Sequence, residues 1–143
     1  MTSTKAEWVT TERRRESPAA SARAAEHAAA RDLALAVAGV AVDRKALKVE
    51  IIDVEGKVDY ADFIVVMSGR SDRQVAALAK NVEGDVKTRT GQRCLSLEGL
   101  PKATWVLMDF GDVIVHIFHE DMRGYYDLEG LWIDAPRVPV PLD

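Results

Sequence analysis

Residues 105–118 constrain the fold more than any other stretch of this 143-residue sequence. Two apolar runs, 105–110 and 113–118, are separated by Gly111 and Asp112. A two-residue break that contains glycine between two β-prone runs is typical of a β-hairpin. With these two residues as the loop, the register of the two strands is fixed. Because side chains alternate along a strand, the register also predicts which residues share a face.

The two faces of the predicted hairpin differ in composition. The wholly apolar face must point to the core: Val106, Met108, Phe110, Val113, Val115 and Ile117. The other face combines large apolar groups with an acid and an imidazole: Trp105, Leu107, Asp109, Ile114, His116 and Phe118. Such a mixture suits a protein contact, in which aromatic groups supply desolvated area and polar groups fix the register. The alternative is that a helix of the same chain covers this face and His116 is a half-buried histidine.

The length and cysteine content narrow the class of protein. A chain of 143 residues can form one domain with a substantial core. No apolar run approaches the roughly 20 residues that are needed to cross a bilayer. The single cysteine, Cys94, cannot form an internal disulfide and is predicted to be a small buried thiol. Since no secretory signal is recognisable, we expect a cytoplasmic protein.

Charge is distributed unevenly along the chain, whose net charge is −4. Between residues 105 and 134, Arg123 is accompanied only by acidic residues: Asp109, Asp112, Glu120, Asp121, Asp127, Glu129 and Asp134. An acidic surface repels phosphate backbones and attracts basic proteins. The predicted large partner is therefore a basic protein, and we expect neither membrane insertion nor sequence-specific nucleic-acid binding.

The sequence divides into three parts. Residues 1–20 are rich in Thr, Ser, Ala, Arg and Glu without an apolar period, and we predict that they form a disordered extension. Residues 21–134 contain the folded domain. Residues 135–143 include Pro136, Pro139 and Pro141, which predicts an extended tail.

The folded part alternates between helical and extended patterns. We predict, in order, a helix over 21–42, strands over 47–54 and 63–67, a helix from 71 to about 90, a short strand over 95–97, the hairpin, and a helix from 120 or 121 to 129. A helix between the second and third strands permits a parallel crossover, whereas the hairpin is antiparallel. The predicted fold class is therefore α+β, with a mixed β-sheet flanked by helices.

The turn before the second predicted helix has a specific chemical pattern. Ser71 and Gln74 have the spacing of a capping box, in which a hydroxyl and an amide satisfy unpaired N–H groups at a helix start. A phosphate-binding loop is the alternative, because a helix N-terminus favours anions. This alternative lacks the glycine-rich motifs GxxxxGK(S/T) and GxGxxG.

No residue pattern predicts catalysis. His116 and His119 are three residues apart on a strand and point to opposite faces, which does not suit a shared metal site. Four aspartates resemble the two-metal set of a nucleotidyltransferase: Asp59, Asp62, Asp109 and Asp112. No basic triphosphate clamp accompanies them. The sequence therefore predicts no enzyme, no metal and no cofactor, and a nucleotidyltransferase-like nucleotide binder or enzyme is the alternative.

Several separated motifs resemble those of the Iojap family, the bacterial and organellar ribosome silencing factors. They are DYADFIVV at 59–66, SGRSDRQV at 68–75, EG at 98–99, WVLMDFGDVIVHIF at 105–118 and RGYYDLEGLW at 123–132. The resemblance covers roughly residues 27–132. Two positions depart from it, because Phe110 stands where the family often has Tyr and Gly130 where it usually has a charged residue.

The resemblance implies a fold and a function. The fold would be a mixed-sheet α+β domain with nucleotidyltransferase-like topology but without the catalytic apparatus. Family members bind the large ribosomal subunit through a basic ribosomal protein of the L-fourteen type, block joining of the small subunit and lower translation in starvation or stationary phase. An exposed aromatic face is also compatible with a homodimer off the ribosome.

The resemblance also implies which residues contact the partner. The hairpin would supply Trp105, Leu107, Asp109, Asp112 and His116, and the last helix would supply Tyr126, Leu128 and Glu129. The alternative is that Tyr126, Leu128 and Trp132 pack the last helix onto the sheet.

Overall fold

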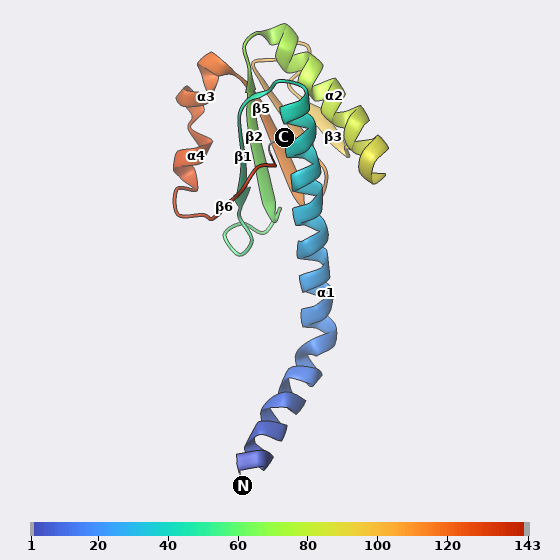
Figure 1. The fold of residues 1–143 in the computed structure, drawn as a ribbon. Helices are drawn as coiled ribbons and strands as arrows, with labels where there is room; N and C mark the ends of the chain where they lie inside the picture. The colour runs from blue at the N-terminus through green and yellow to red at the C-terminus, as the bar shows by residue number, and fades with distance from the viewer. Residues whose placement is uncertain (1, 142–143) are drawn as a thin grey trace.

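A mixed β-sheet with helices on both faces forms the centre of the molecule (Figure 1). The computed structural model describes the backbone of residues 2–141 and the side chains of residues 18–141. Its elements are α1 (Thr2–Asp43), β1 (Leu47–Asp53), β2 (Phe63–Gly69), α2 (Asp72–Thr90), β3 (Ser96–Glu98), β4 (Trp105–Asp109), β5 (Val113–His119), α3 (Glu120–Tyr126), α4 (Leu128–Leu131) and β6 (Arg137–Val138). Within the described residues the strands form one six-stranded sheet in the order β3-β4-β5-β2-β1-β6.

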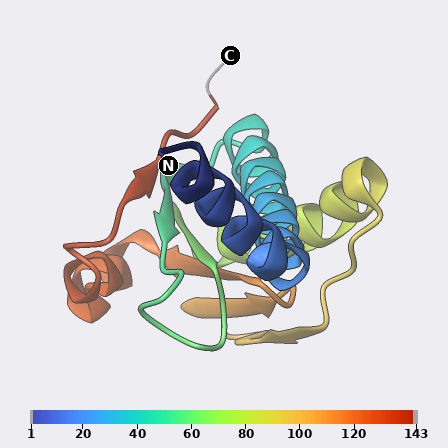
Figure 2. The ribbon, with the colours of Figure 1, turned by 90° about the horizontal axis from the view of Figure 1, so that it is seen from below.

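Two apolar cores lie on opposite faces of this sheet. Helices α1 and α2 pack side by side on one face, and the larger core lies beneath them (Figure 2). Helices α3 and α4 lie on the other face, over a smaller core that includes Ile64, Val66 and Phe118 (Figure 1). Pairing is antiparallel except between β2 and β5, which run parallel. The predicted α+β class, with a mixed sheet flanked by helices, is confirmed.

The hairpin of β4 and β5 has the predicted register. Trp105 pairs with Phe118, and the Phe110 N–H donates to the Val113 carbonyl over 2.9 Å. Gly111 has φ +96°, a left-handed conformation that glycine adopts without steric cost. All members of the predicted core face are buried and belong to the larger core: Val106, Met108, Phe110, Val113, Val115 and Ile117.

The parallel neighbour of β2 is not the next strand in the chain. The sequence pattern permitted a parallel crossover to residues 95–97, but β2 runs parallel to β5, and β3 pairs with β4 at the far edge of the sheet. β3 has only three residues, so it contributes few backbone hydrogen bonds. The longer, almost wholly apolar strand β5 takes the central position instead, because its side chains can be buried on both faces of the sheet.

The helix predicted at the end of the domain is split in two. Asp127 has φ +46°, which ends α3, and its side chain accepts a hydrogen bond from the Gly130 N–H at the start of α4. Asn and Asp tolerate this left-handed conformation better than other residues that carry a Cβ.

The first helix is longer than the predicted one. The sequence pattern placed the first helix at residues 21–42, after a disordered extension over 1–20, whereas α1 begins at Thr2. Ala, Arg and Glu, which are frequent there, have high helix propensity. The N-terminal part of α1 projects beyond the sheet (Figure 1), and its burial against the core begins near Ala30. In the proline-rich tail, Arg137–Val138 extends the sheet by pairing with β1. The division into three parts stays a prediction.

The predicted side-chain capping at the start of α2 is present, but the Gln74 side chain returns to Arg70, the residue before the N-cap Ser71. Ser71 Oγ accepts a hydrogen bond from the Gln74 N–H over 3.1 Å, and Gln74 Oε1 accepts one from the Arg70 N–H over 2.6 Å. Gly91, with φ +79°, ends the helix. Ser71 and Gln74 therefore serve helix capping at this turn. Across the described part of the chain, no helix is both long enough and apolar enough to cross a membrane.

Candidate functional site

The outward side of β4 is the main uncovered part of the hairpin. Helix α3 packs mainly on β5 and β2, so it covers the β5 side of the mixed hairpin face. The outward side chains of β4 are only partly buried. We call this uncovered surface the β4 face, and it consists of Glu98, Trp105, Leu107, Asp109 and Tyr126. The sheet register places Glu98 beside Leu107, and Tyr126 reaches Trp105 from α3.

The side chain of Trp105 is held in place by several contacts within the β4 face and beneath it. Its indole N–H donates to His116 Nδ1 over 3.0 Å. Its ring packs against Tyr126 with a centroid distance of 4.4 Å and stacks on Phe118 at 5.1 Å. A half-buried tryptophan held by a hydrogen bond and two rings loses little conformational entropy when a partner covers it. Such pre-ordered aromatic groups are common energetic centres of protein interfaces.

His116 lies beneath Trp105 rather than on the surface. His116 is only 7% exposed, and this burial lowers the pKa of its imidazole from 6.5 to about 4. The ring is therefore neutral near pH 7. Since Nδ1 accepts the Trp105 hydrogen bond, the proton of the neutral ring resides on Nε2. This burial favours a positioning role for His116, and the expectation that His116 itself contacts a partner stays a prediction.

Leu107 and Asp109 complete the β4 part of the face. Leu107 and Trp105 line a shallow, mainly apolar cavity of about 260 Å³ together with Glu98 and Gly99. Asp109 Oδ1 accepts a hydrogen bond from the Gly111 N–H over 2.7 Å, so one carboxylate oxygen stabilises the hairpin turn. Its charge still contributes to the potential of the surface.

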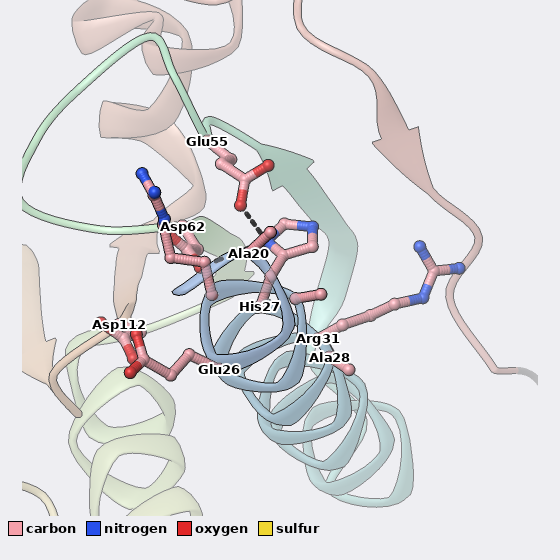
Figure 3. A pocket seen from close by; sticks show the side chains of 10 residues that line it. Ala20, Glu26, His27, Ala28, Arg31, Glu55, Asp62 and Asp112 are labelled. Carbon is pink, nitrogen blue, oxygen red and sulfur yellow. Dashed lines mark hydrogen bonds and ion pairs between the residues drawn. The ribbon is translucent and has the colours of Figure 1, made fainter. Parts of the chain in front are cut away.

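Three other predicted contact residues lie elsewhere. Asp112 is at the hairpin tip and lines a different cavity, beside α1 (Figure 3). Leu128 is half-buried against the smaller core, as the packing alternative predicted. Glu129 Oε2 accepts a hydrogen bond from Arg123 Nε over 3.0 Å, and its Oε1 has no hydrogen-bond partner among the described residues. The structure therefore brings together Trp105 and its neighbours but not all of the expected contacts.

Sequence reasoning missed the role of Arg123. This residue is 5% exposed, and its guanidinium donates to Ser68 Oγ over 3.0 Å and to Glu50 Oε2 over 3.3 Å, besides Glu129. The available signal was that Arg123 stands alone in an acidic stretch, which is unusual for a surface residue. Because the one basic side chain of residues 105–134 is buried, the exposed charge of this stretch is entirely acidic.

Further large apolar side chains on and after α3 are exposed to solvent. Tyr125 is 79% exposed, Leu131 69% and Ile133 77%. Acidic side chains lie between them in the sequence, including the exposed Asp127. Apolar groups interspersed with a single sign of charge suit a basic protein partner better than a nucleic acid.

The structure gives little support to catalysis by the residues that sequence analysis considered. The four aspartates do not converge, since Asp109 binds its own turn while Asp62 Oδ2 lies 3.2 Å from His27 Nδ1. Cys94 is half-buried, and burial followed by the charge of Glu83 raises the pKa of its thiol. A protonated thiol is a poor nucleophile.

The fold and the β4 face define a small α+β domain with an ordered aromatic surface. A family model described as "Ribosomal silencing factor during starvation" matches residues 25–143. The chain belongs to this family.

Individual relatives agree with this assignment. The chain is 44% identical over 94 residues to the ribosomal silencing factor RsfS of Bacillus subtilis, and the aligned region covers 66% of this chain and 79% of that protein. It is 45% identical over 96 residues to RsfS of Halalkalibacterium halodurans, covering 67% and 81%. A crystal structure of a Chromobacterium violaceum protein matches with a TM-score of 0.68 and 28% identity, covering 79% of this chain and 92% of that one.

Proposed function

We propose that this protein is a translational regulator that acts in the cytoplasm by binding the large ribosomal subunit. In this proposal it docks on a basic ribosomal protein of the L-fourteen type and sterically blocks joining of the small subunit. Membership of the ribosomal silencing factor family supports the biological process. The observation that carries the docking mode is the uncovered β4 face, centred on Trp105.

The composition of the β4 face suits such a partner. Trp105, Leu107 and Tyr126 offer apolar area, and Glu98 and Asp109 add negative charge at its margin. A basic protein would be attracted by the charges and would exclude water from the aromatic centre. No chemical step is needed for inhibition, because a protein of 15.7 kDa bound at a subunit interface occupies space that the second subunit requires.

The first test measures binding to purified large subunits and to the isolated L-fourteen-type protein. We expect Trp105→Ala and Leu107→Ala to weaken binding by roughly 10- to 100-fold, the range of interface hot spots. Asp109→Asn keeps the oxygen that accepts from Gly111 and removes only the charge. It should therefore weaken binding mainly at low salt.

Two matched substitutions on the β1–β2 loop control for nonspecific effects. Tyr60 is 55% exposed, so Tyr60→Ala removes an exposed aromatic group, and Asp59→Asn removes an exposed charge. Both variants should bind like the unchanged protein. If the Trp105 and Leu107 variants are folded by circular dichroism and bind with unaltered affinity, the proposed surface is wrong.

A second test asks what binding does. Sucrose-gradient sedimentation should place the protein with free large subunits, and added protein should reduce formation of joined ribosomes from purified subunits. Co-sedimentation with small subunits alone would contradict the proposal.

The same face would also serve a homodimer off the ribosome. A dimer that used Trp105 would have to dissociate before docking. Analytical ultracentrifugation of the unchanged protein and of Trp105→Ala would show concentration-dependent association in the first and its loss in the second.

A further inference from the structure

A separate cluster of metal-ligating side chains lies beside α1, away from the β4 face. His27 projects from α1, while Glu55 and Asp62 lie on the segment that connects β1 to β2 (Figure 3). One potential ligand atom from each of the three residues lies within 4.8 Å of the other two. These residues are far apart in sequence, and it is the packing of α1 against the β1–β2 connection that brings them together.

The distances within the cluster are short. His27 Nδ1 lies 2.8 Å from Glu55 Oε2 and 3.2 Å from Asp62 Oδ2. One imidazole nitrogen and two carboxylate oxygens therefore form a compact group in which both oxygens converge on the nitrogen. This donor set suits Zn²⁺ and the related divalent transition metals, which accept both nitrogen and oxygen ligands.

The imidazole is held in position by its surroundings. Its ring stacks on Phe63 with a centroid distance of 4.9 Å and an interplanar angle of 26°. On the other side of the ring, Nε2 lies 3.8 Å from Asp53 Oδ2. A metal-binding histidine usually directs its second ring nitrogen at a carboxylate or carbonyl, which fixes the tautomer with a free lone pair toward the metal. Asp53 lies on this side of the ring, and its 3.8 Å separation from Nε2 is longer than a hydrogen bond.

The backbone at the two acidic residues is also held in place by hydrogen bonds. The Asp62 N–H donates to the Asp112 carbonyl over 2.8 Å. The Glu55 N–H donates to Asp53 Oδ1 over 3.1 Å. The two carboxylate oxygens already lie 2.8 Å and 3.2 Å from the imidazole nitrogen. Small side-chain movements would therefore be enough to place each of the three ligand atoms roughly 2.1 Å from a bound ion.

The charge of the site favours a dication. Asp53, Glu55 and Asp62 surround a single imidazole. Two arginines, Arg23 and Arg31, also line the adjacent cavity, and the guanidinium of Arg31 points away from the cluster in Figure 3. The cluster borders a cavity of about 900 Å³ that is also lined by Glu26 and other residues of α1. Three protein ligands leave a coordination position open toward this cavity, which water can fill.

We propose that His27, Glu55 and Asp62 form a binding site for a divalent transition-metal ion of the Zn²⁺ class. Nδ1 of His27 would donate its lone pair to the ion, and the Nε2–H would face Asp53. The bound ion would tie α1 to the β1–β2 connection, so it would stabilise the folded state. This proposal departs from the metal-free expectation of the sequence, and it does not depend on ribosome binding.

The test is calorimetric titration of the chelator-treated full chain with Zn²⁺. We expect one ion per chain. His27→Gln and Asp62→Asn should each weaken binding at least 10-fold, and Zn²⁺ should raise the unfolding temperature of the unchanged protein but not of these variants. Glu26→Gln is the matched control, because Glu26 is adjacent to His27 and lines the same cavity without belonging to the ligand set. It should bind Zn²⁺ normally.

Absorption spectroscopy with Co²⁺ as a substitute ion tests independently whether a thiolate takes part in the site. The Co²⁺ complex should show d–d bands without a thiolate charge-transfer band, since Cys94 is not a ligand. Circular dichroism without metal should show that His27→Gln is folded. Unaltered Zn²⁺ affinity in folded His27→Gln, a thiolate band, or the absence of saturable binding to the unchanged protein would each overturn the proposal.

Discussion

Protonation of His116 provides a quantitative test of the packing beneath the β4 face. Burial lowers the pKa of this imidazole from 6.5 to about 4, so the folded protein resists a proton that the unfolded chain accepts. The neutral ring also accepts the Trp105 N–H, which an imidazolium cannot do. A group with a depressed folded-state pKa contributes its full stability above pH 6.5. That contribution is lost as the pH falls from 6.5 toward 4.

The magnitude follows from linkage. Each pH unit between the unfolded-state and folded-state pKa values changes the free energy of unfolding by about 1.4 kcal/mol. At pH 5, about 1.5 units below the unfolded-state value, His116 should therefore lower the free energy of unfolding by about 2 kcal/mol. Below pH 4 the loss should level off at about 3 kcal/mol.

The assay is urea unfolding of the unchanged protein and of His116→Gln at pH 7.5 and pH 5. Glutamine retains an oxygen that can accept the Trp105 N–H but has no proton to gain in this range. The loss of stability between the two pH values should be about 2 kcal/mol larger in the unchanged protein, since all other titrating groups are shared. Equal losses in the two proteins, or an NMR titration of His116 with a pKa near 6.5, would refute the packing.

Three further predictions concern stability and are measured by urea unfolding. Gly99→Ala should destabilise the fold by several kcal/mol, because φ is +106° and a Cβ at this position would overlap the Trp105 carbonyl. Gly84→Ala in α2 should instead stabilise the fold by about 0.5–1 kcal/mol, because a Cβ there meets nothing within 4 Å. The reverse order would show that these backbone environments are wrong. Arg123→Met should cost about 3 kcal/mol, because it leaves two carboxylates and a buried hydroxyl without their donor. A neutral effect would contradict its burial. Ser71→Ala should cost about 1 kcal/mol through loss of the helix cap, and Ser71→Asp should restore most of it.

Local sequence patterns predicted the hairpin and the start of α2 because the physical determinants of these elements lie close together in sequence. Gly111 accepts the positive φ of the turn, and alternation from it fixes which side chains face the core. Ser71 and Gln74 are three residues apart and cap the helix directly. Neither feature needs information about the rest of the chain.

Features that depend on contacts between distant segments were predicted less well. The parallel pairing of β2 with β5 results from competition among strands for the central positions, which no local pattern reveals. The burial of His116 depends on where α3 lies. The division of the predicted last helix into α3 and α4 depends on one backbone conformation, at Asp127. The cluster around His27 was missed for the same reason, since its three ligands meet only after α1 packs on the sheet.

The two proposed sites lie on opposite faces of the sheet, and this separation can be tested. The ring of His27 stacks on Phe63, whose side chain belongs to the larger core, whereas Trp105 stacks on Phe118 in the smaller core. Substitutions without shared contacts are usually additive within about 0.5 kcal/mol. His27→Gln should therefore leave affinity for the large subunit unchanged, and Trp105→Ala should leave Zn²⁺ affinity unchanged. A double variant whose unfolding free energy departs from the sum of the single changes by more than about 1 kcal/mol would show that the sheet transmits a change from one face to the other. Metal binding would then have to be considered as a regulator of docking.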